Sequence, residues 1–396
     1  MQPALPAEMP LYVFAALDRR LERRRDRGEE VLDLTKSDPT FAPPAEAMAA
    51  LAAALRDPEA HRYPPFAGTD ELRREIAAWY GRRFGVRLDP DRQVYVTAGS
   101  KEGLVHLAQA LVRPGEAVLV PDPGFPAYAA AARLAGAHLV PLPLLPEEGH
   151  LPDLAAAARR SAAPVRLVYL NYPNNPTGAL APAAYFAAVA DWARRAGMWV
   201  CHDLAYADIF AGPTPPPSFL AAPHALEVGV ETITWSKSYA MQGLRLGAVV
   251  GNEDAVAAFA HLESHIMAGV YPAVQRAGAA CLREVEPSAS YLAEPRRRYR
   301  ARLERLAEPF ARAGWPDLLP AGAVYLWPEA PEGMDGTQFA RLLLDEAGVA
   351  VTPGSAFGRT GRGRVRLSAT PTDAVVDRAA DALDRLLGRR RLRPPS

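Results

Sequence analysis

Short apolar runs alternate with longer helical stretches from about residue 94 to residue 250, and this alternation constrains the fold more than any other feature of the chain. The apolar runs are rich in β-branched residues, as strands are, and occupy residues 94–97, 117–121, 165–170, 198–203, 232–236 and 246–251. The stretches between them carry apolar stripes with the helical period, as in residues 102–112, 184–197 and 255–264. This order predicts an α/β fold in which helices cover a mainly parallel sheet.

The pattern changes outside this region. The elements predicted there are amphipathic helices and short strands, at residues 11–25, 31–36, 287–314, 323–327, 363–368 and 372–389. The first two are too small to fold alone, so we expect them to pack against the C-terminal part. We therefore predict a large domain over residues 46–286 and a smaller α+β domain formed by residues 1–45 and 287–396.

Composition argues against several classes of function. The formal net charge at pH 7 is zero, which gives no electrostatic reason to expect a nucleic-acid or membrane partner. Two cysteines cannot form a disulfide framework, and without histidines at ligand spacing they predict no metal site. The N-terminal sequence lacks the apolar core of a secretion signal, and no apolar stretch is long enough to span a bilayer, so we expect a cytoplasmic location.

Lysine is rare in this chain, and each lysine therefore requires a cause. Of the 45 basic residues only Lys36, Lys101 and Lys237 are lysine. A guanidinium stays protonated, whereas a desolvated lysine amine can lose its proton and attack a carbonyl. Lys237 follows an apolar run, and both Lys237 and Lys101 lie in Gly/Ser-rich turns that suit phosphate, so the sequence predicts a phosphorylated carbonyl cofactor bound to a lysine. The ordinary alternative is a surface lysine whose stem covers apolar residues.

Residues near these lysines could bind the phosphate group. Arg245 follows Lys237 in the same segment and can grip a phosphate with two hydrogen bonds. Hydroxyl and backbone N–H donors are expected from residues 99–101, Thr234 and Ser236. Each of these features alone indicates no more than a helix cap, and only their convergence favours a phosphate site.

Two further motifs follow predicted strands. Asp203 and Tyr206 lie in HDLAYADIF, where a buried carboxylate could keep a ring nitrogen protonated and a phenol could bond a ring oxygen. The alternative for this pair is an Asp cap beside a packed tyrosine. The NYPNNPTG turn, at residues 171–178, directs Asn175 to the same edge of the sheet.

Together these motifs resemble the class I and II aminotransferases, which are fold type I pyridoxal-phosphate enzymes. The resemblance rests on NPTG at residues 175–178, DxAY at 203–206, SKxxxxxGxRxG at 236–247 and VRLS at 365–368. It spans nearly the whole chain in order. The opening residues 5–20 and the GSKEG loop at 99–103 look most like the diaminopimelate or succinyl-diaminopimelate aminotransferase branch.

The resemblance implies a fold and a cofactor chemistry. The implied fold is a large domain with a mainly parallel, seven-stranded sheet sandwiched by helices, plus a smaller α+β domain. Lys237 would form an internal aldimine with pyridoxal 5′-phosphate and act as general acid and base. Asp203 would pair with the pyridine nitrogen, Tyr206 and Asn175 would bond the phenolic oxygen, and Phe125 would stack on the ring. The cofactor-binding residues implied are Gly99, Ser100, Lys101, Phe125, Asn175, Asp203, Tyr206, Thr234, Ser236, Lys237 and Arg245, with Tyr63 reaching across from the partner subunit of a homodimer.

The resemblance also implies substrate contacts. Arg366 would bind the substrate carboxylate beside Asn175, and the smaller domain would close over the substrate. Where relatives read like LGIGDP, this chain has LTKSDP at residues 34–39, so Ser37 replaces a glycine and Lys36 an apolar residue. We predict that Lys36 faces the mouth of the site and selects an acidic or polar substrate tail. The alternative is that Lys36 points to solvent, because strand side chains alternate.

The predicted activity is transfer of an amino group between an L-amino acid and a 2-oxo acid. Candidate substrates are diaminopimelate, succinyl-diaminopimelate and aspartate-like acids. We expect the contacts that select among them to come from loops, including the N-terminal segment, with Tyr12, Tyr128 and Tyr325 as candidates whose positions in space the sequence does not give. A C–S lyase of the same fold is the alternative, because the same lysine and cofactor can support elimination at the β-carbon. A third class, a transcription regulator with an aminotransferase-like domain, needs an N-terminal DNA-binding module, for which the 45 residues before the large domain leave no room.

Overall fold

A seven-stranded sheet forms the centre of the molecule. The computed structural model describes residues 9, 12–283 and 291–395. The strand order is β2-β8-β7-β6-β5-β3-β4, and neighbours are parallel except at β8, which is antiparallel to β2 and β7. The strands are β2 Val94–Thr97, β3 Ala117–Asp122, β4 His138–Pro143, β5 Val165–Leu170, β6 Trp199–Asp203, β7 Gly229–Thr234 and β8 Gly247–Gly251. The predicted α/β class with a mainly parallel, seven-stranded sheet is confirmed.

Two strands of the large sheet differ clearly from the prediction. Strand β4 was not predicted; it lies at the edge of the sheet, pairs only with β3 and contains two prolines, which weaken a strand pattern. Strand β7 covers Gly229–Thr234, so the predicted strand over residues 232–236 was wrong at both ends. The Thr234 hydroxyl accepts a hydrogen bond from the Ser236 N–H and so begins helix α9, Trp235–Ser238.

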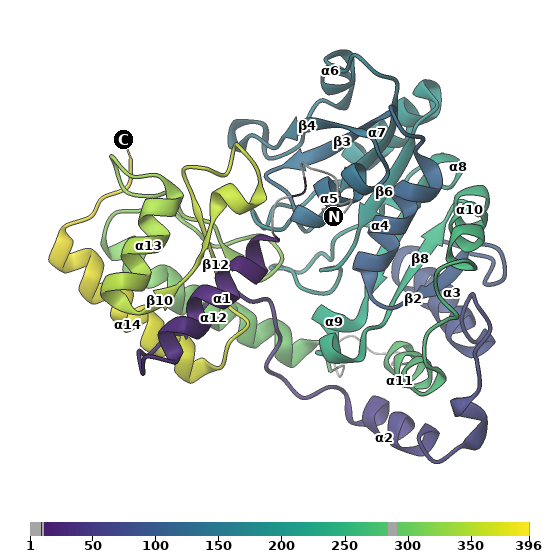
Figure 1. Ribbon diagram of the computed structural model, residues 1–396, viewed down its shortest axis with the longest axis horizontal. Helices are drawn as coiled ribbons and strands as arrows, with labels where there is room; N and C mark the ends of the chain where they lie inside the picture. Colours follow the sequence, from purple (N-terminus) through teal and green to yellow (C-terminus); the bar gives the residue numbers. More distant parts are fainter. Residues whose placement is uncertain (1–8, 10–11, 284–290, 396) are drawn as a thin grey trace, which may run out of the picture.

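Helices cover both faces of this sheet (Figure 1). Successive side chains of a strand point to opposite faces. Accordingly, Val168 of β5 packs in the core under α3, α7 and α11, whereas Tyr169 packs in the core under α4, α5 and α10. The helices of this larger part, besides α9, are α2 Ala45–Ala54, α3 Asp70–Phe84, α4 Ser100–Leu111, α5 Pro126–Leu134, α6 Leu154–Arg159, α7 Ala183–Ala196, α8 Ala225–Val228, α10 Glu253–Glu263 and α11 Pro272–Leu282.

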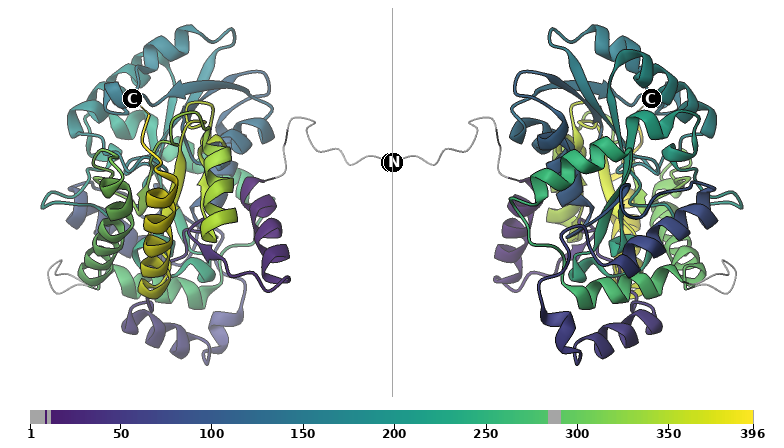
Figure 2. Two further views of the ribbon diagram at one scale, coloured as in Figure 1. Left: turned by 90° about the vertical axis from the view of Figure 1, so that its left-hand side faces the viewer. Right: turned by 90° about the vertical axis from the view of Figure 1, so that its right-hand side faces the viewer.

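A smaller part with its own core lies beside the large sheet. It contains a three-stranded antiparallel sheet of order β11-β12-β9 and a parallel pair, β1 with β10. The left view of Figure 2 shows its helices side by side in the order α12 (green), α14 (yellow), α13 (yellow-green) and α1 (purple). Its elements are α1 Val13–Arg25, β1 Leu32–Asp33, α12 Ala293–Arg312, β9 Tyr325–Leu326, α13 Gly336–Ala347, β10 Val349–Ala350, β11 Thr352–Pro353, β12 Val365–Ser368 and α14 Asp373–Arg390.

The N-terminal segment packs against the C-terminal part. Leu21 of α1 contacts Leu344 and Ala350, and β1 pairs with β10. The predicted boundary between residues 286 and 287, and the start of the helix predicted from residue 287, lie outside the described residues. The division into two domains therefore stays a prediction. Within the described ranges, no helix has the length and apolar character needed to cross a bilayer, and no three His, Cys, Asp or Glu side chains are placed to share a metal ion.

Candidate active site

A pocket of about 630 Å³ opens at one edge of the large sheet. The loops that follow β2, β3, β5, β6 and β7 reach it, as expected for a ligand site in an open α/β sheet. All three lysines of the sequence line this one pocket. The predicted site residues that line it are Lys36, Ser37, Ser100, Lys101, Phe125, Asn175, Asp203, Tyr206, Thr234, Ser236, Lys237, Arg245 and Arg366.

Lys237 lies on α9, directly after the carboxyl end of β7. Its Nζ donates a hydrogen bond to the backbone oxygen of Ser37 at 2.5 Å. Burial lowers the pKa of this amine from 10.5 to about 8; the negative charge of Asp38 opposes that shift, and the positive charges of Arg366 and Arg245 add to it. Roughly a tenth of the amine is therefore neutral at pH 7, and a neutral amine can act as a nucleophile or a base.

Asp203 ends β6 with its carboxyl group buried. The Tyr128 hydroxyl donates to Asp203 Oδ2 at 2.8 Å, and the Thr232 hydroxyl donates to Oδ1 at 3.3 Å. The Asn171 side-chain amide donates to the Asp203 backbone oxygen at 2.8 Å and fixes this strand end. Burial raises the pKa of Asp203, against the hydrogen bond from Tyr128. Since no cationic side chain in the described part of the chain pairs with this carboxylate, a cationic ligand atom beside it would be stabilised.

Tyr206, Tyr325 and Ser37 form a chain of hydroxyl groups. The Tyr206 and Tyr325 oxygens lie 2.5 Å apart, and Tyr325 donates to Ser37 Oγ at 2.6 Å. The three residues come from the loop after β6, from β9 and from the segment after β1, so the chain connects the two parts of the molecule. Ser37 supplies an oxygen here that a glycine would lack.

Arg366 on β12 is only 1% exposed. One of its terminal nitrogens donates to Asn175 Oδ1 at 2.9 Å and the other to the Thr35 backbone oxygen at 2.7 Å. Its Nε has no hydrogen-bond partner within the described residues. The guanidinium carbon lies 4.3 Å from the centre of the Tyr325 ring. A buried guanidinium with no carboxylate partner and a free N–H suits an anionic ligand.

The start of α4 and Arg245 converge on one side of the pocket. Gly99, just before α4, has a φ of 91°, and a Cβ there would lie 2.3 Å from an Arg245 terminal nitrogen, so glycine is required. Arg245 donates to the backbone oxygens of Ala98 at 3.3 Å and Gln242 at 2.8 Å. Backbone N–H groups at a helix start beside a guanidinium form an anion site.

Further donors adjoin this anion site. The Thr234 hydroxyl donates to Ser236 Oγ at 2.9 Å. The Lys101 ammonium lies 4.1 Å from the centre of the Tyr12 ring, and burial, together with the charge of Arg245, lowers the pKa of Lys101. Each of these groups also lines the pocket, so hydroxyl and cationic donors surround the start of α4.

Lys36 lies at the rim of the pocket. Its ammonium pairs with Asp18 Oδ1 of α1 at 3.0 Å, and this hydrogen bond raises the pKa of Lys36. The two side chains are 48% and 39% exposed, and both line the pocket. The rim therefore presents a positive and a negative group side by side.

Tyr63 does not line the pocket of this chain. Its side chain is 89% exposed, and the large apolar side chains of Phe66, Ile266 and Tyr271 are also exposed. The segment of residues 63–66 and the segment of residues 266–271 are adjacent, because a Cβ at Gly269 would lie 2.8 Å from the side chain of Pro64. This arrangement leaves an apolar surface on the larger part.

The pocket is also lined by Tyr12, Tyr128 and Tyr325, which were candidates for side-chain selectivity without a predicted position, and by Asn171, which was not predicted. Tyr128 follows Phe125 by one helical turn of α5, and that spacing could have indicated a shared direction. Tyr325 contacts Ser37 across 288 positions of sequence, which no local pattern signals. Asn171 lies in the same NYPNNPTG turn as Asn175, but only Asn175 was predicted as a site residue. Tyr12 could not be placed from sequence because it precedes an isolated helix.

Comparisons with known proteins agree with this geometry. The family model of the aminotransferases of class I and II matches residues 29–383. An LL-diaminopimelate aminotransferase of Desulforudis audaxviator is 41% identical over 381 residues, which are 96% of this chain and 95% of that protein. One of Moorella thermoacetica is 40% identical over 382 residues, covering 96% and 97%. The solved structure of a probable N-succinyldiaminopimelate aminotransferase from Thermus thermophilus superposes with a TM-score of 0.86 at 36% identity, covering 95% of this chain and 100% of that one.

Proposed function

Because the chain belongs to the class I and II aminotransferases and is a pyridoxal-phosphate-dependent enzyme, we propose that it transfers an amino group between LL-diaminopimelate, or a closely similar diamino dicarboxylic acid, and a 2-oxo acid. The family resemblance predicted from NPTG, DxAY and the Lys237 motif is confirmed. The single observation that carries the proposal is one pocket that holds the Lys237 amine, the buried Asp203 carboxylate and the Arg366 guanidinium, whose Nε has no hydrogen-bond partner within the described residues. The C–S lyase alternative gains no support from the relatives compared.

The rim of the pocket supports this choice of substrate. LL-diaminopimelate carries a second ammonium and a second carboxylate at the end remote from the reacting carbon. Lys36 and Asp18 offer one charge of each sign at the mouth, so each could exchange its partner for a group of the substrate. The two relatives named as LL-diaminopimelate aminotransferases, which are 40–41% identical to this chain, also support this choice of substrate.

The described residues fit pyridoxal phosphate. When bound, this cofactor supplies an aldehyde that bonds to amines and a conjugated ring that withdraws electrons from the substrate. We propose that Asp203 holds the protonated ring nitrogen, because no described cationic side chain pairs with its buried carboxylate, and that Phe125 covers one ring face. The groups proposed to hold the phosphate are Gly99, Ser100, Lys101, Thr234, Ser236 and Arg245.

Each remaining site residue has a proposed task in the reaction. Lys237 Nζ, positioned by the Ser37 backbone oxygen, would carry the proton between the substrate α-carbon and the cofactor. Arg366 would bind the substrate α-carboxylate with two parallel hydrogen bonds. Asn175 accepts from Arg366 and has its own amide N–H groups left to donate, so with Tyr206 it would bond the ring oxygen. The Ser37 hydroxyl accepts a hydrogen bond from Tyr325 and would thereby hold the Tyr325 ring in the wall of the substrate site.

We also propose a homodimer in which Tyr63 reaches the pocket of the partner subunit. The support is the exposed apolar surface around Tyr63, since large exposed apolar patches mark interaction sites. An enzyme that is monomeric by sedimentation velocity and still fully active would reject the dimer.

The separate cores on the two sides of the pocket support the proposed division into a domain of residues 46–286 and one of residues 1–45 and 287–396. Cytoplasmic location stays a prediction.

A panel of amino donors tests the proposed function. The pyridoxal form of the enzyme is mixed with LL-diaminopimelate, aspartate, alanine or cystathionine, and loss of the cofactor's visible absorbance is followed in a single turnover. We expect LL-diaminopimelate to react with the highest specificity constant and to leave the pyridoxamine form. Release of pyruvate and ammonia from cystathionine, without that form, would indicate the lyase instead.

The pKa of Lys237 predicts a pH dependence for cofactor binding. Only the neutral amine attacks an aldehyde, and the pKa of about 8 makes roughly a tenth of it neutral at pH 7. The rate at which the cofactor-free enzyme recombines with pyridoxal phosphate should therefore rise about tenfold per pH unit below 8 and level off above it. Stopped-flow absorbance measures this rate. A profile still rising steeply at pH 10 would show an unperturbed lysine.

Replacing Lys36 with methionine should weaken the use of LL-diaminopimelate selectively. The pair with Asp18 is half exposed, so the loss should be modest, about three- to tenfold in kcat/KM, which corresponds to roughly 1 kcal/mol. Alanine, which has no remote charge, should react at nearly the unchanged rate. Equal changes for both donors would remove Lys36 from substrate selection.

A further inference from the structure

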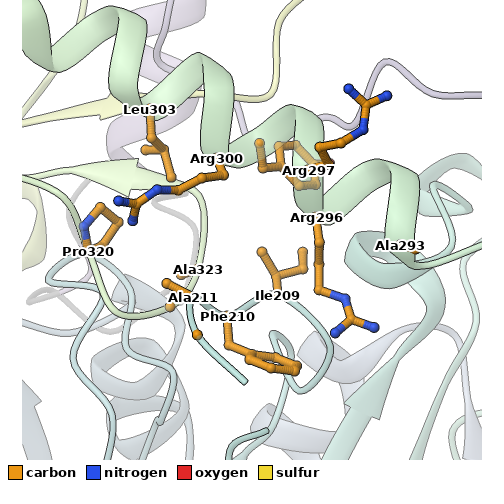
Figure 3. A pocket seen from close by; sticks show the side chains of 13 residues that line it. Ile209, Phe210, Ala211, Ala293, Arg296, Arg297, Arg300, Leu303, Pro320 and Ala323 are labelled. Atoms are coloured by element: carbon orange, nitrogen blue, oxygen red, sulfur yellow. The ribbon is translucent and has the colours of Figure 1, made fainter. Parts of the chain in front are cut away.

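A second cavity, of about 500 Å³, lies on the surface away from the lysine-lined pocket. One wall is the first half of α12, and the other is formed by residues 209–212, which follow β6, with Pro320, Gly322 and Ala323. Figure 3 shows this hollow between the helix and the two loop segments. Its volume is within the range of small-molecule sites. None of the reaction steps above uses it.

Arginine dominates the helical wall. Arg296, Arg297 and Arg300 line the cavity. In Figure 3, Arg296 extends into the hollow toward Phe210 and Arg300 extends toward Pro320, whereas Arg297 points away from it. Arg296 and Arg300 are half-buried and Arg297 is exposed. Two of the three guanidinium groups therefore face the same hollow.

Arg296 differs from the other arginines of α12 in its pairing. Residues 297, 298, 300, 302, 305 and 312 each form an ion pair with Asp or Glu. Arg296 forms none with any residue of the described ranges; its guanidinium lies 4.8 Å from the centre of the Phe210 ring, and its Nε donates to the Leu292 backbone oxygen at 3.4 Å. Arg300 uses its Nε for Glu304, at 2.6 Å.

Arg296 lies close enough to Arg83 for its charge to affect the pKa of that residue. Burial lowers the pKa of Arg83, and the charge of Arg296 adds to that effect. Arg83 itself lies 3.7 Å from Asp208, so that carboxylate already has a partner. The cavity therefore contains a cation that has no carboxylate partner among the described residues and lies beside an aromatic ring.

We propose that this cavity binds a small organic anion through a phosphate or carboxylate group. Arg296 would supply two parallel N–H donors, since its terminal nitrogens make no hydrogen bond within the described residues, and Arg300 would add a second positive charge. Phe210 would pack against the apolar portion of the ligand. The cavity shares Ile209, Tyr299 and Ala323 with the cluster that contains Tyr206 and Tyr325, so the bound anion would contact the back of the active-site wall.

Calorimetric titration of the enzyme loaded with pyridoxal phosphate tests this site. Inorganic phosphate and citrate are the probes, at constant ionic strength. Arg297→Gln is the matched control, because it removes an arginine that lines the cavity but points away from it. We expect at least one probe to bind the unaltered enzyme and Arg297→Gln alike, and to bind Arg296→Gln at least about tenfold more weakly. Amino transfer should be unchanged in both variants, which shows that they are folded.

Two results would overturn the proposal. Binding that is equally strong in Arg296→Gln would place the anion at another site, including the lysine-lined pocket. If neither probe binds the unaltered enzyme, the arginines of α12 form only a solvated surface and not a binding site. Neither result would bear on the aminotransferase activity, because no residue of the proposed reaction lines this cavity.

Discussion

Replacing Lys237 with arginine is expected to lower the single-turnover rate of amino transfer by at least about 10³-fold. Arginine preserves the positive charge beside Asp38, but its guanidinium cannot lose a proton in the pH range of the reaction. The variant would lack both the amine that bonds the cofactor aldehyde and the base that moves the α-proton, and general acid–base catalysis alone contributes about 10²–10⁴-fold. Rapid mixing with LL-diaminopimelate, followed by absorbance, measures the rate.

The matched control is the same substitution at Lys101. This lysine lines the same pocket, and the proposal gives it only the task of placing positive charge near the phosphate. Arginine retains that charge, so Lys101→Arg should keep activity within about tenfold of the unaltered enzyme. Similar losses in the two variants would mean that the shape of the pocket, and not the amine of Lys237, limits the reaction.

Replacing Asp203 with asparagine is expected to lower the rate of amino transfer by at least about 10²-fold. An asparagine oxygen could still accept the hydrogen bond from Tyr128, but the negative charge at the end of β6 would be lost. That charge is proposed to keep the ring nitrogen protonated, and removal of one preorganised electrostatic contact in an active site typically costs about 10²–10³-fold. The rate of proton removal from α-deuterated donors measures the effect on the chemical step.

Asp208→Asn is the control for this variant. Asp208 is also buried and follows the same strand, but it pairs with Arg83 outside the active pocket. Loss of its charge should lower the melting temperature and leave the rate per folded molecule nearly unchanged. If the Asp203→Asn enzyme lost stability but kept its rate of amino transfer, Asp203 would have a structural role and no catalytic one.

Sequence patterns predicted the sheet better at its centre than at its edge. Strands inside the sheet such as β3 are buried along their whole length, so the apolar run over residues 117–121 is unbroken and easily seen. Strand β4 pairs on one side only and contains Pro141 and Pro143, and its pattern is weak for that reason. The end of β7 was set by the hydroxyl of Thr234, which begins a helix where β-branched and aromatic residues suggested a longer strand.

The site was predictable where its residues lie in compact motifs at strand ends. Lys237, Asp203 and Asn175 each follow an apolar run, and parallel strands bring such ends to one edge. Contacts between distant segments were not predictable. The hydrogen bond from Arg366 to Asn175 spans 191 positions, and the pair of Lys36 with Asp18 depends on how α1 packs on the smaller part. The rarity of lysine was the strongest single signal, because arginine can replace lysine wherever only charge is needed.

Borohydride reduction of the enzyme loaded with pyridoxal phosphate, followed by peptide mapping, tests the central claim most directly. The claim is that the amine of Lys237, with its lowered pKa, is the group that bonds the cofactor. We predict one pyridoxyl group per chain, on the peptide that contains Lys237. A pyridoxyl group on Lys36 or Lys101 instead, or none on folded protein with the cofactor in excess, would contradict the account.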